Sequence, residues 1–267
     1  MPEGPEVKKI GESLSERISL RTLKQINILS GRYSKNTPEN FKEICSQLPV
    51  QIAGPGVHGK FIFIILKNKW SIWNTLGMTG GWSRERKKHS RLEFVLDDGS
   101  IFFNDQRNFG TVKFVNDGKL LVDKLRSLGP DMLSGEVPDG DFVNIMRKYQ
   151  RKTLPEVLMN QKAVAGVGNY IKAEALYLAK LSPHRTVESL SDEEIVNLKQ
   201  SIQKVMKESF ATGGATIRTY SDFNGEIGKY GSRFIVYNQS KDPAGNQVVK
   251  EKTKDNRTTH WVPTVQK

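Results

Sequence analysis

The second and third residues of the chain, Pro2 and Glu3, form the pair with the most distinctive chemistry. An initiator methionine followed by a small residue is normally removed, so we expect Pro2 to carry a free secondary amine. An α-amino group titrates near a pH of about 8, so part of it is neutral and nucleophilic at neutral pH. Its condensation at the anomeric carbon of a sugar gives an iminium that has no N–H to lose and therefore favours elimination. Glu3 could act as general acid to the sugar ring oxygen.

The same two residues also have an ordinary structural explanation. Proline is common in the first turn of a helix, and glutamates are favourable near the positive end of the helix dipole. Val7, Ile10 and Leu14 follow at helical spacing, which predicts a short amphipathic helix that begins almost at residue 2.

The charge of the chain indicates a polyanionic partner. Its 41 basic and 29 acidic residues give a net charge of 41 − 29 = +12. Such a surface favours nucleic acid over an anionic membrane, although a merely basic soluble protein or a ribosomal protein would share it.

Cys45 is the only cysteine, which excludes an intrachain disulfide and favours an intracellular setting. No stretch approaches the roughly 18 apolar residues of a membrane span, so we expect a soluble protein.

The periodicity of the chain changes along its length and predicts three domains. Six short β-rich runs between residues 20 and 116 indicate an antiparallel sandwich or barrel. They are LKQINIL, KFIFIIL, SIWNTL, RLEFVL, SIFFN and TVKFV. Helical spacing follows, with a capping box that begins at Ser191 and an apolar face made by Ile195, Leu198, Ile202, Val205 and Met206. The last stretch carries the runs FIVYNQ, VVKEK and TTHWVP, with a turn at Asp255-Asn256, and predicts a β-hairpin. Packing of residues such as Val248, Trp261 and Val262 is expected to support it. The predicted domains are 1–129, 130–222 and 223–267.

Two segments resemble one known family. Met1-Pro2-Glu3-Gly4-Pro5-Glu6-Val7 is similar to the start of the formamidopyrimidine-DNA glycosylase and endonuclease VIII family, and Ala165-Gly166-Val167-Gly168-Asn169-Tyr170 with Glu174 is similar to its helix-two-turn-helix hallmark. The resemblance extends over the whole chain. It implies an α+β fold with an N-terminal helix and an antiparallel β-sandwich, a helix-two-turn-helix domain and a hairpin finger. It also implies Pro2 as nucleophile, Glu3 as general acid and Glu6 as a supporting residue.

Three further positions are candidates for contacts with DNA phosphates. His58-Gly59-Lys60-Phe61 looks like the family segment whose lysine lies by the active-site phosphate; a lysine there would also favour the neutral amine of Pro2. Asn169 follows glycines whose backbone could approach a phosphate at the start of a helix. His89 belongs to the basic run 84–91. The ordinary alternatives are a solvated lysine, a helix N-cap and a solvated loop.

Met78, Arg107 and Phe109 resemble the three residues that fill the gap left by an everted nucleotide. Apolar side chains replace the missing base stacking, and an arginine can pair with the orphaned base. Taken singly, Met78 and Phe109 would be better explained by ordinary core packing.

The C-terminal segment departs from the commonest pattern of the family. Zinc needs about four thiolate or imidazole ligands, and only His260 qualifies between residues 223 and 267. The segment 256–263 resembles the zincless finger of plant formamidopyrimidine glycosylases and of some endonuclease VIII-like enzymes, with Arg257 at the place of the phosphate-gripping arginine. We therefore expect no metal and no cofactor.

These features predict a monomeric bifunctional DNA glycosylase and AP lyase that acts on double-stranded DNA containing oxidised bases or abasic sites. Pro155 stands where purine-specific relatives carry a lysine, which favours oxidised pyrimidines and hydantoins as substrates. The alternatives are an enzyme that prefers 8-oxoguanine and formamidopyrimidines, a non-catalytic binder of damaged DNA, and a basic RNA-binding protein.

Overall fold

The computed structural model describes residues 1–215, 223 and 228–267, and these form two compact units. The first comprises Met1–Pro2, Glu6–Ser127 and Gly213–Lys229, and the second comprises Glu3–Pro5, Leu128–Thr212 and Tyr230–Lys267. The predicted domains 1–129, 130–222 and 223–267 stay a prediction, and the predicted boundary at residue 222 lies outside the described residues.

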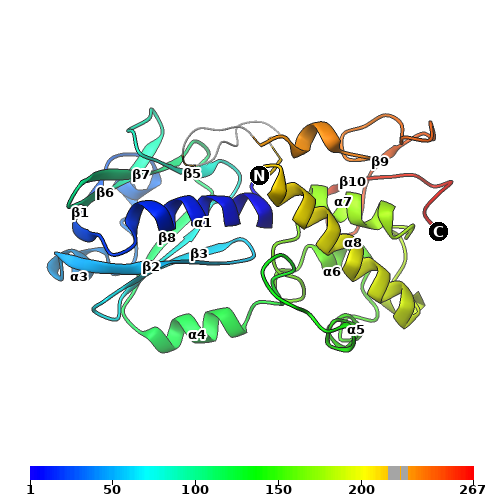
Figure 1. Ribbon diagram of the computed structural model, residues 1–267, viewed down its shortest axis with the longest axis horizontal. Coiled ribbons are helices and arrows are strands. Elements are labelled where there is room, and N and C mark those ends of the chain that lie inside the picture. Colours follow the sequence, from blue (N-terminus) through cyan, green and yellow to red (C-terminus); the bar gives the residue numbers. More distant parts are fainter. Residues whose placement is uncertain (216–222, 224–227) are drawn as a thin grey trace. The chain divides into compact units, whose positions relative to one another are not determined.

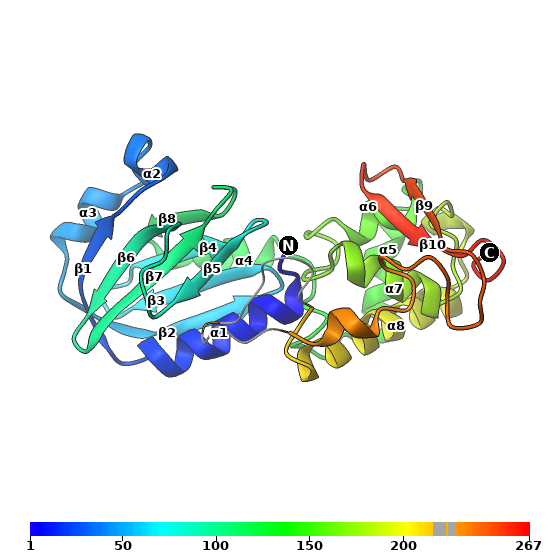
Figure 2. The same cartoon turned by 90° about the horizontal axis from the view of Figure 1, so that it is seen from above.

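Within the described residues, the first unit contains an eight-stranded antiparallel sheet with the order β5-β7-β6-β1-β2-β3-β4-β8. Strands β1 and β2 pair only through Thr22 with Gln51 and Leu23 with Val50, so the sheet consists of two four-stranded halves. Figures 1 and 2 show these strands together with helix α1, Gly4–Ile18. Apolar side chains from both halves of the sheet form one core. The strands are β1 Thr22–Ile28, β2 Val50–His58, β3 Phe61–Leu66, β4 Ser71–Thr75, β5 Gly80–Ser83, β6 Ser90–Leu96, β7 Gly99–Asp105 and β8 Thr111–Val115.

The β-rich runs of the sequence correspond to six of these strands, and the predicted antiparallel architecture is confirmed. Strands β2 and β5 were missed. Strand β2 contains Gly54-Pro55-Gly56 and β5 begins with Gly80-Gly81. Glycine and proline are depleted from strands, so these segments resemble turns until a neighbouring strand pairs with them.

Helix α1, Gly4–Ile18, confirms the predicted amphipathic helix. Val7, Ile10, Leu14 and Ile18 are all at most 1% exposed and pack into the core of the sheet. The remaining helices of the first unit are α2 Arg32–Lys35, α3 Phe41–Ser46 and α4 Gly118–Arg126.

The second unit is helical and ends in a hairpin (Figure 1). The capping box of α8 is confirmed, because the Ser191 hydroxyl accepts from Glu194 N at 3.1 Å and the Glu194 carboxylate accepts from Ser191 N at 2.8 Å. The five apolar residues predicted for the buried face of α8 are all 0% exposed. The helices are α5 Asp139–Arg147, α6 Leu154–Leu158, α7 Asn169–Leu178, η1 Val187–Ser189, α8 Asp192–Ala211 and η2 Tyr230–Arg233.

Strands β9 Val249–Lys252 and β10 Thr258–Trp261 form the predicted antiparallel hairpin. The run FIVYNQ (234–239) forms no strand, which corrects that part of the prediction. The N–H groups of Ile235, Val236 and Tyr237 donate at 2.8 to 2.9 Å to the buried Glu174 carboxylate, so they are not available to a neighbouring strand.

The hairpin packs on α7 through a small apolar cluster. Val248 and Val262, which the sequence predicts to support the hairpin, are buried there with Ala173 and Val236. Trp261 was also expected in this packing but lies partly exposed, with its ring 5.2 Å from the His184 ring. Within the described part of the chain, no helix has the length and apolar character needed to cross a bilayer.

Candidate active site and nucleic-acid interface

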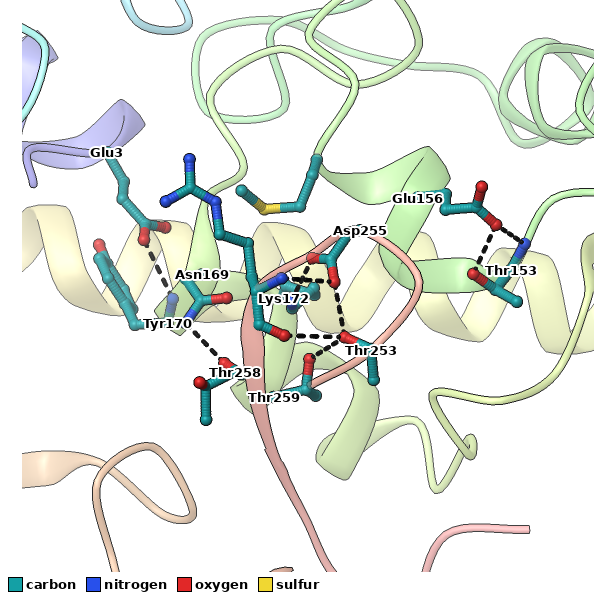
Figure 3. A network of polar contacts seen from close by, with 12 residues as sticks. Glu3, Thr153, Glu156, Asn169, Tyr170, Lys172, Thr253, Asp255, Thr258 and Thr259 are labelled. Atoms are coloured by element: carbon teal, nitrogen blue, oxygen red, sulfur yellow. Dashed lines mark hydrogen bonds and ion pairs between the residues drawn. The ribbon is translucent and has the colours of Figure 1, made fainter. Parts of the chain in front are cut away.

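Glu3 lies at the start of helix α7 in the second unit (Figure 3). Its side chain is buried, and its carboxylate oxygens accept from Tyr170 N at 3.0 Å and from Ile171 N at 3.3 Å. The first amides of a helix have no partner within the helix and carry its partial positive charge. The helix start therefore fixes the position of the Glu3 carboxylate.

Gly168 is the residue that lets Glu3 come so close. A Cβ at Gly168 would lie 2.2 Å from Glu3 Cδ, so any larger residue would displace the carboxylate. The sequence predicts that these glycines admit a phosphate to the helix start. In the structure two of the amides there, those of Tyr170 and Ile171, bind the carboxylate of Glu3. A phosphate contact through the remaining groups of the helix start stays a prediction.

Pro2 directly precedes Glu3, Glu6 follows it three residues later, and both are buried. Glu6 accepts a hydrogen bond of 2.7 Å from Ala215 N. Gly214 next to it has φ +89°, and a Cβ there would lie 2.9 Å from the Glu6 side chain. Glu6 therefore holds the backbone just after the long helix α8. Its role as a supporting residue of the active site stays a prediction.

Lys60 and His89 occupy turns of the first unit. Lys60 is half-buried in the two-residue turn Gly59-Lys60 between β2 and β3. His89 is half-buried just before β6, and its carbonyl accepts from Asp105 N at 3.0 Å. Their roles as phosphate contacts stay predictions.

Met78, Arg107 and Phe109 lie on two neighbouring loops of the first unit. Gly77 has φ +59°, and a Cβ there would lie 2.7 Å from the backbone of Phe109, so the loops touch at this glycine. The Phe109 side chain is 54% exposed, and the Arg107 guanidinium lies over its ring at 4.8 Å. Met78 is half-buried. Core packing is therefore not the explanation of Phe109.

Asp105 is the residue that joins these two loops, and sequence reasoning missed it. Its buried carboxylate accepts from the Thr79 hydroxyl at 2.6 Å, from Gly110 N at 2.7 Å and from Arg107 N at 3.2 Å. A buried carboxylate with three donors holds both loops in one geometry. An aspartate at the end of a strand resembles a common turn residue in the sequence, so nothing there distinguished it.

Arg91 requires a correction to the predicted phosphate-binding edge 84–91. Its side chain is buried and donates to the carbonyl of Asp105 at 2.7 Å and to the Ser30 hydroxyl at 2.9 Å. Arg91 therefore holds the backbone that directly precedes Arg107. Arg84, Arg86, Lys87 and Lys88 are exposed, so they remain available to solvent.

Replacing Asp105 by alanine is expected to lower the free energy of unfolding of the first unit by about 1–3 kcal/mol, because buried donors are left without their acceptor. Faster hydrogen exchange of the Gly110 and Arg107 amides would localise the change. Asp97→Ala is the matched control: the exposed Asp97 carboxylate accepts from Thr22 N at 3.2 Å, and its removal should cost within about 0.5 kcal/mol. Equal effects of the two variants would contradict the role of Asp105.

Asn169 and Arg257 lie near each other in the second unit. Asn169 is the first residue of α7, and Gly168 occupies the N-cap position. The alternative that Asn169 is the N-cap residue is therefore wrong. The side-chain amide of Asn169 donates to the carbonyl of Thr258 at 2.9 Å (Figure 3). Arg257 directly precedes Thr258 at the tip of the hairpin and is exposed. The start of α7 thus brings together Glu3, Asn169 and the hairpin tip.

No group of three or more His, Cys, Asp or Glu side chains that could hold a metal ion is found among residues 1–215, 223 and 228–267. The hairpin tip is instead held by hydrogen bonds and a buried ion pair with α7.

Three family models match consecutive parts of the chain. They describe the formamidopyrimidine-DNA glycosylase N-terminal domain over residues 1–112, the H2TH domain over 128–221 and the C-terminal domain over 230–267. A formamidopyrimidine-DNA glycosylase of Listeria monocytogenes is 32% identical over 278 aligned positions, with 100% of each chain covered.

Solved structures agree with these matches. The MutM (Fpg) protein of Thermus thermophilus has a TM-score of 0.88 and 30% identity, with coverage of 99% of this chain and 98% of that one. A Lactococcus lactis Fpg mutant in complex with Fapy-dG-containing DNA has a TM-score of 0.89 and 28% identity, with both chains fully covered. The chain therefore belongs to the formamidopyrimidine-DNA glycosylase family, a family of DNA glycosylases of base excision repair.

Proposed function

We propose that the protein is a bifunctional DNA glycosylase and AP lyase that uses the amine of Pro2, freed by removal of Met1, as its nucleophile. The observation that carries the proposal is the buried Glu3 carboxylate, fixed by two amides of α7 directly beside Pro2 in the chain of a member of this family. A nucleophile and an adjacent acid are the two groups that opening a nucleotide sugar requires.

The reaction balances with these two groups and water, which takes the protons lost from the sugar carbons and hydrolyses the iminium at the end. The Pro2 nitrogen forms a bond to C1′ of the damaged nucleotide, the glycosidic bond breaks, and the base leaves with a proton. Glu3 protonates the ring oxygen as the sugar opens to an iminium. Loss of a proton from C2′ expels the 3′ phosphate, and a second elimination expels the 5′ phosphate. Hydrolysis of the iminium releases Pro2 and leaves a gap with phosphates at both ends.

The DNA-contacting residues fall into two groups in this proposal. Lys60, His89, Asn169 and Arg257 contact phosphates, and the planar guanidinium of Arg257 is suited to a bidentate contact. Met78 and Phe109 fill the space of the everted nucleotide, and Arg107 pairs with the orphaned base. The exposure of Phe109 and its contact with Arg107, on two loops joined by Asp105, support this second role.

The two groups should separate in binding experiments. Met78→Ala, Arg107→Ala and Phe109→Ala are each expected to reduce the preference for an abasic-site duplex over an undamaged one, because these side chains act on the unstacked state. Lys60→Ala and Asn169→Ala are expected to weaken binding to both duplexes and to lower the salt slope by about one unit for each phosphate that is no longer bound. Salt titrations of both duplexes measure the two quantities, and the reverse division would contradict the assignment.

For the substrate we propose oxidised pyrimidines and hydantoins. Pro155, which replaces the lysine of purine-specific relatives, is buried in the first turn of α6 and offers no charged group. Formamidopyrimidines and 8-oxoguanine are the second candidate, favoured by the names of the relatives and by the Fapy-dG in the Lactococcus lactis complex. Faster single-turnover excision of 8-oxoguanine opposite cytosine than of thymine glycol would decide for the second candidate.

The activity itself is tested by following base release and strand cleavage separately on duplexes with thymine glycol, a hydantoin, 8-oxoguanine or a preformed abasic site. Both events are expected without added metal or alkali, and the cut ends should carry phosphates on both sides. Base release without strand cleavage would refute the lyase, and the absence of base release from all three duplexes that carry a damaged base would refute the glycosylase.

A further inference from the structure

Lys172 and Asp255 form a buried ion pair between helix α7 and the hairpin tip (Figure 3). Lys172 Nζ lies 2.6 Å from the Asp255 carboxylate, and the two side chains are 0% and 3% exposed. Burial lowers the pKa of the Lys172 ammonium, and the hydrogen bond to Asp255 opposes that shift. A charge inside a protein is costly unless it is paired, so each partner requires the other.

Asp255 is also the centre of the hairpin turn. Its second oxygen accepts from the Thr253 hydroxyl at 2.6 Å and from the backbone N–H of Arg257 at 3.3 Å. The Thr253 and Thr259 hydroxyls lie 2.7 Å apart and join the two strands beneath the turn. The carboxylate that binds Lys172 therefore directly holds the backbone of Arg257.

One face of α7 carries three contacts to the hairpin. Asn169, Lys172 and Ala173 are spaced i, i+3 and i+4 and so share one face of the helix. Asn169 donates to the carbonyl of Thr258, Lys172 pairs with Asp255, and Ala173 packs in the apolar cluster with Val262. The first two contacts lie on either side of Arg257 in the sequence, so α7 fixes the backbone on both sides of this residue.

We propose that Lys172 is a positioning residue for Arg257, and that its buried pair with Asp255 sets the place from which Arg257 grips a DNA phosphate. The inference rests on the proposed phosphate contact of Arg257. A role in stability alone is a poor explanation of this pair, because buried ion pairs often stabilise a protein no more than apolar residues of similar size. The ion pair, with the further hydrogen bonds of Asp255 to the turn, instead fixes the orientation of the hairpin tip.

The experiment measures the Kd of the full chain for a duplex that carries a tetrahydrofuran abasic analogue, across a range of salt concentrations, together with the melting temperature. Arg257→Ala is expected to raise the Kd on the order of tenfold and to lower the salt slope by about one unit. Lys172→Met should raise the Kd by a similar factor. Introduced into the Arg257→Ala variant, Lys172→Met should cause little further loss of affinity, because residues that act through one contact are not additive.

Two further variants separate positioning from stability. Lys172→Met combined with Asp255→Asn removes both buried charges but keeps an oxygen that accepts from Thr253 and Arg257, so it should fold and still bind DNA weakly. Lys199→Met is the matched control: Lys199 is a buried lysine on α8 that pairs with Asp139 on α5 and donates to the carbonyl of Val137, away from the hairpin. The melting temperature of the Lys199→Met variant should fall, while its Kd for the duplex changes by less than about twofold.

Three results would overturn the inference: a wild-type Kd for the charge-free double variant, a loss of affinity in Lys172→Met that is equally large in the Arg257→Ala background, or a loss in Lys199→Met as large as in Lys172→Met. A wild-type Kd and salt slope for Arg257→Ala would overturn the proposed phosphate contact and the inference together. The two failures are therefore distinguishable.

Discussion

Replacement of Pro2 by glycine is expected to remove most of the covalent enzyme–DNA adduct that borohydride traps. Reduction converts the iminium into a stable amine, so the adduct reports the nucleophile directly. Glycine supplies a primary amine whose imine can lose its proton, and it lacks the ring that presets the geometry of the nitrogen. Loss of a nucleophile costs more than loss of a binding interaction, and a decrease on the order of a hundredfold or more is expected in the trapping rate.

Pro5→Ala is the matched control for this variant. Pro5 is a second buried proline three residues along the same segment, but its nitrogen lies within the chain and cannot condense with a sugar. It should retain most of the trapping. A variant with extra residues before Pro2 should lose trapping, since acylation removes the nucleophile, and intact mass establishes whether Met1 is absent from each sample. Equal trapping by the extended protein would rule out Pro2.

Glu3→Gln is expected to lower single-turnover base release by roughly 10²–10⁴-fold, the usual contribution of a general acid. Strand cleavage at a preformed abasic site should be retained in part, because that substrate has no base to expel. The structure adds a reason for choosing glutamine: one amide oxygen can still accept from Tyr170 N or Ile171 N, so the start of α7 keeps part of its cap. The two rates are measured on matched duplexes under excess enzyme.

Glu156→Gln controls for loss of a helix-capping carboxylate. Glu156 caps α6 in the same unit, where it accepts from Thr153 N at 2.9 Å. This variant should lose some stability and keep both activities. If Glu3→Gln instead lowered base release and abasic-site cleavage by the same factor, Glu3 would serve both steps or the fold, and its assignment as the acid that opens the sugar ring during base release would be wrong.

The sequence by itself determined the local elements and identified the N-terminal residues whose chemistry we propose. Helix α1, the capping box of α8 and the β9–β10 hairpin were predictable because apolar periodicity, capping and turn residues depend on near neighbours in the chain. The candidates Pro2 and Glu3 were found from their residue types, and the family resemblance drew attention to Lys60, Asn169 and Arg257. The strands β2 and β5 were missed because their glycines and proline are local turn signals that strand pairing overrides.

Only the tertiary structure decided which buried polar groups meet. Glu3 caps a helix 167 residues away, Lys172 pairs with a carboxylate 83 residues away, and Glu174 binds an amide 62 residues away. Asp105 and Arg91 likewise join loops, and no local sequence pattern predicts that these loops are in contact. The same residue types are usually solvated on a protein surface, so their identity carries no sign of burial. A buried charge persists only where the fold supplies its partner, and that partner is known only once the chain has folded.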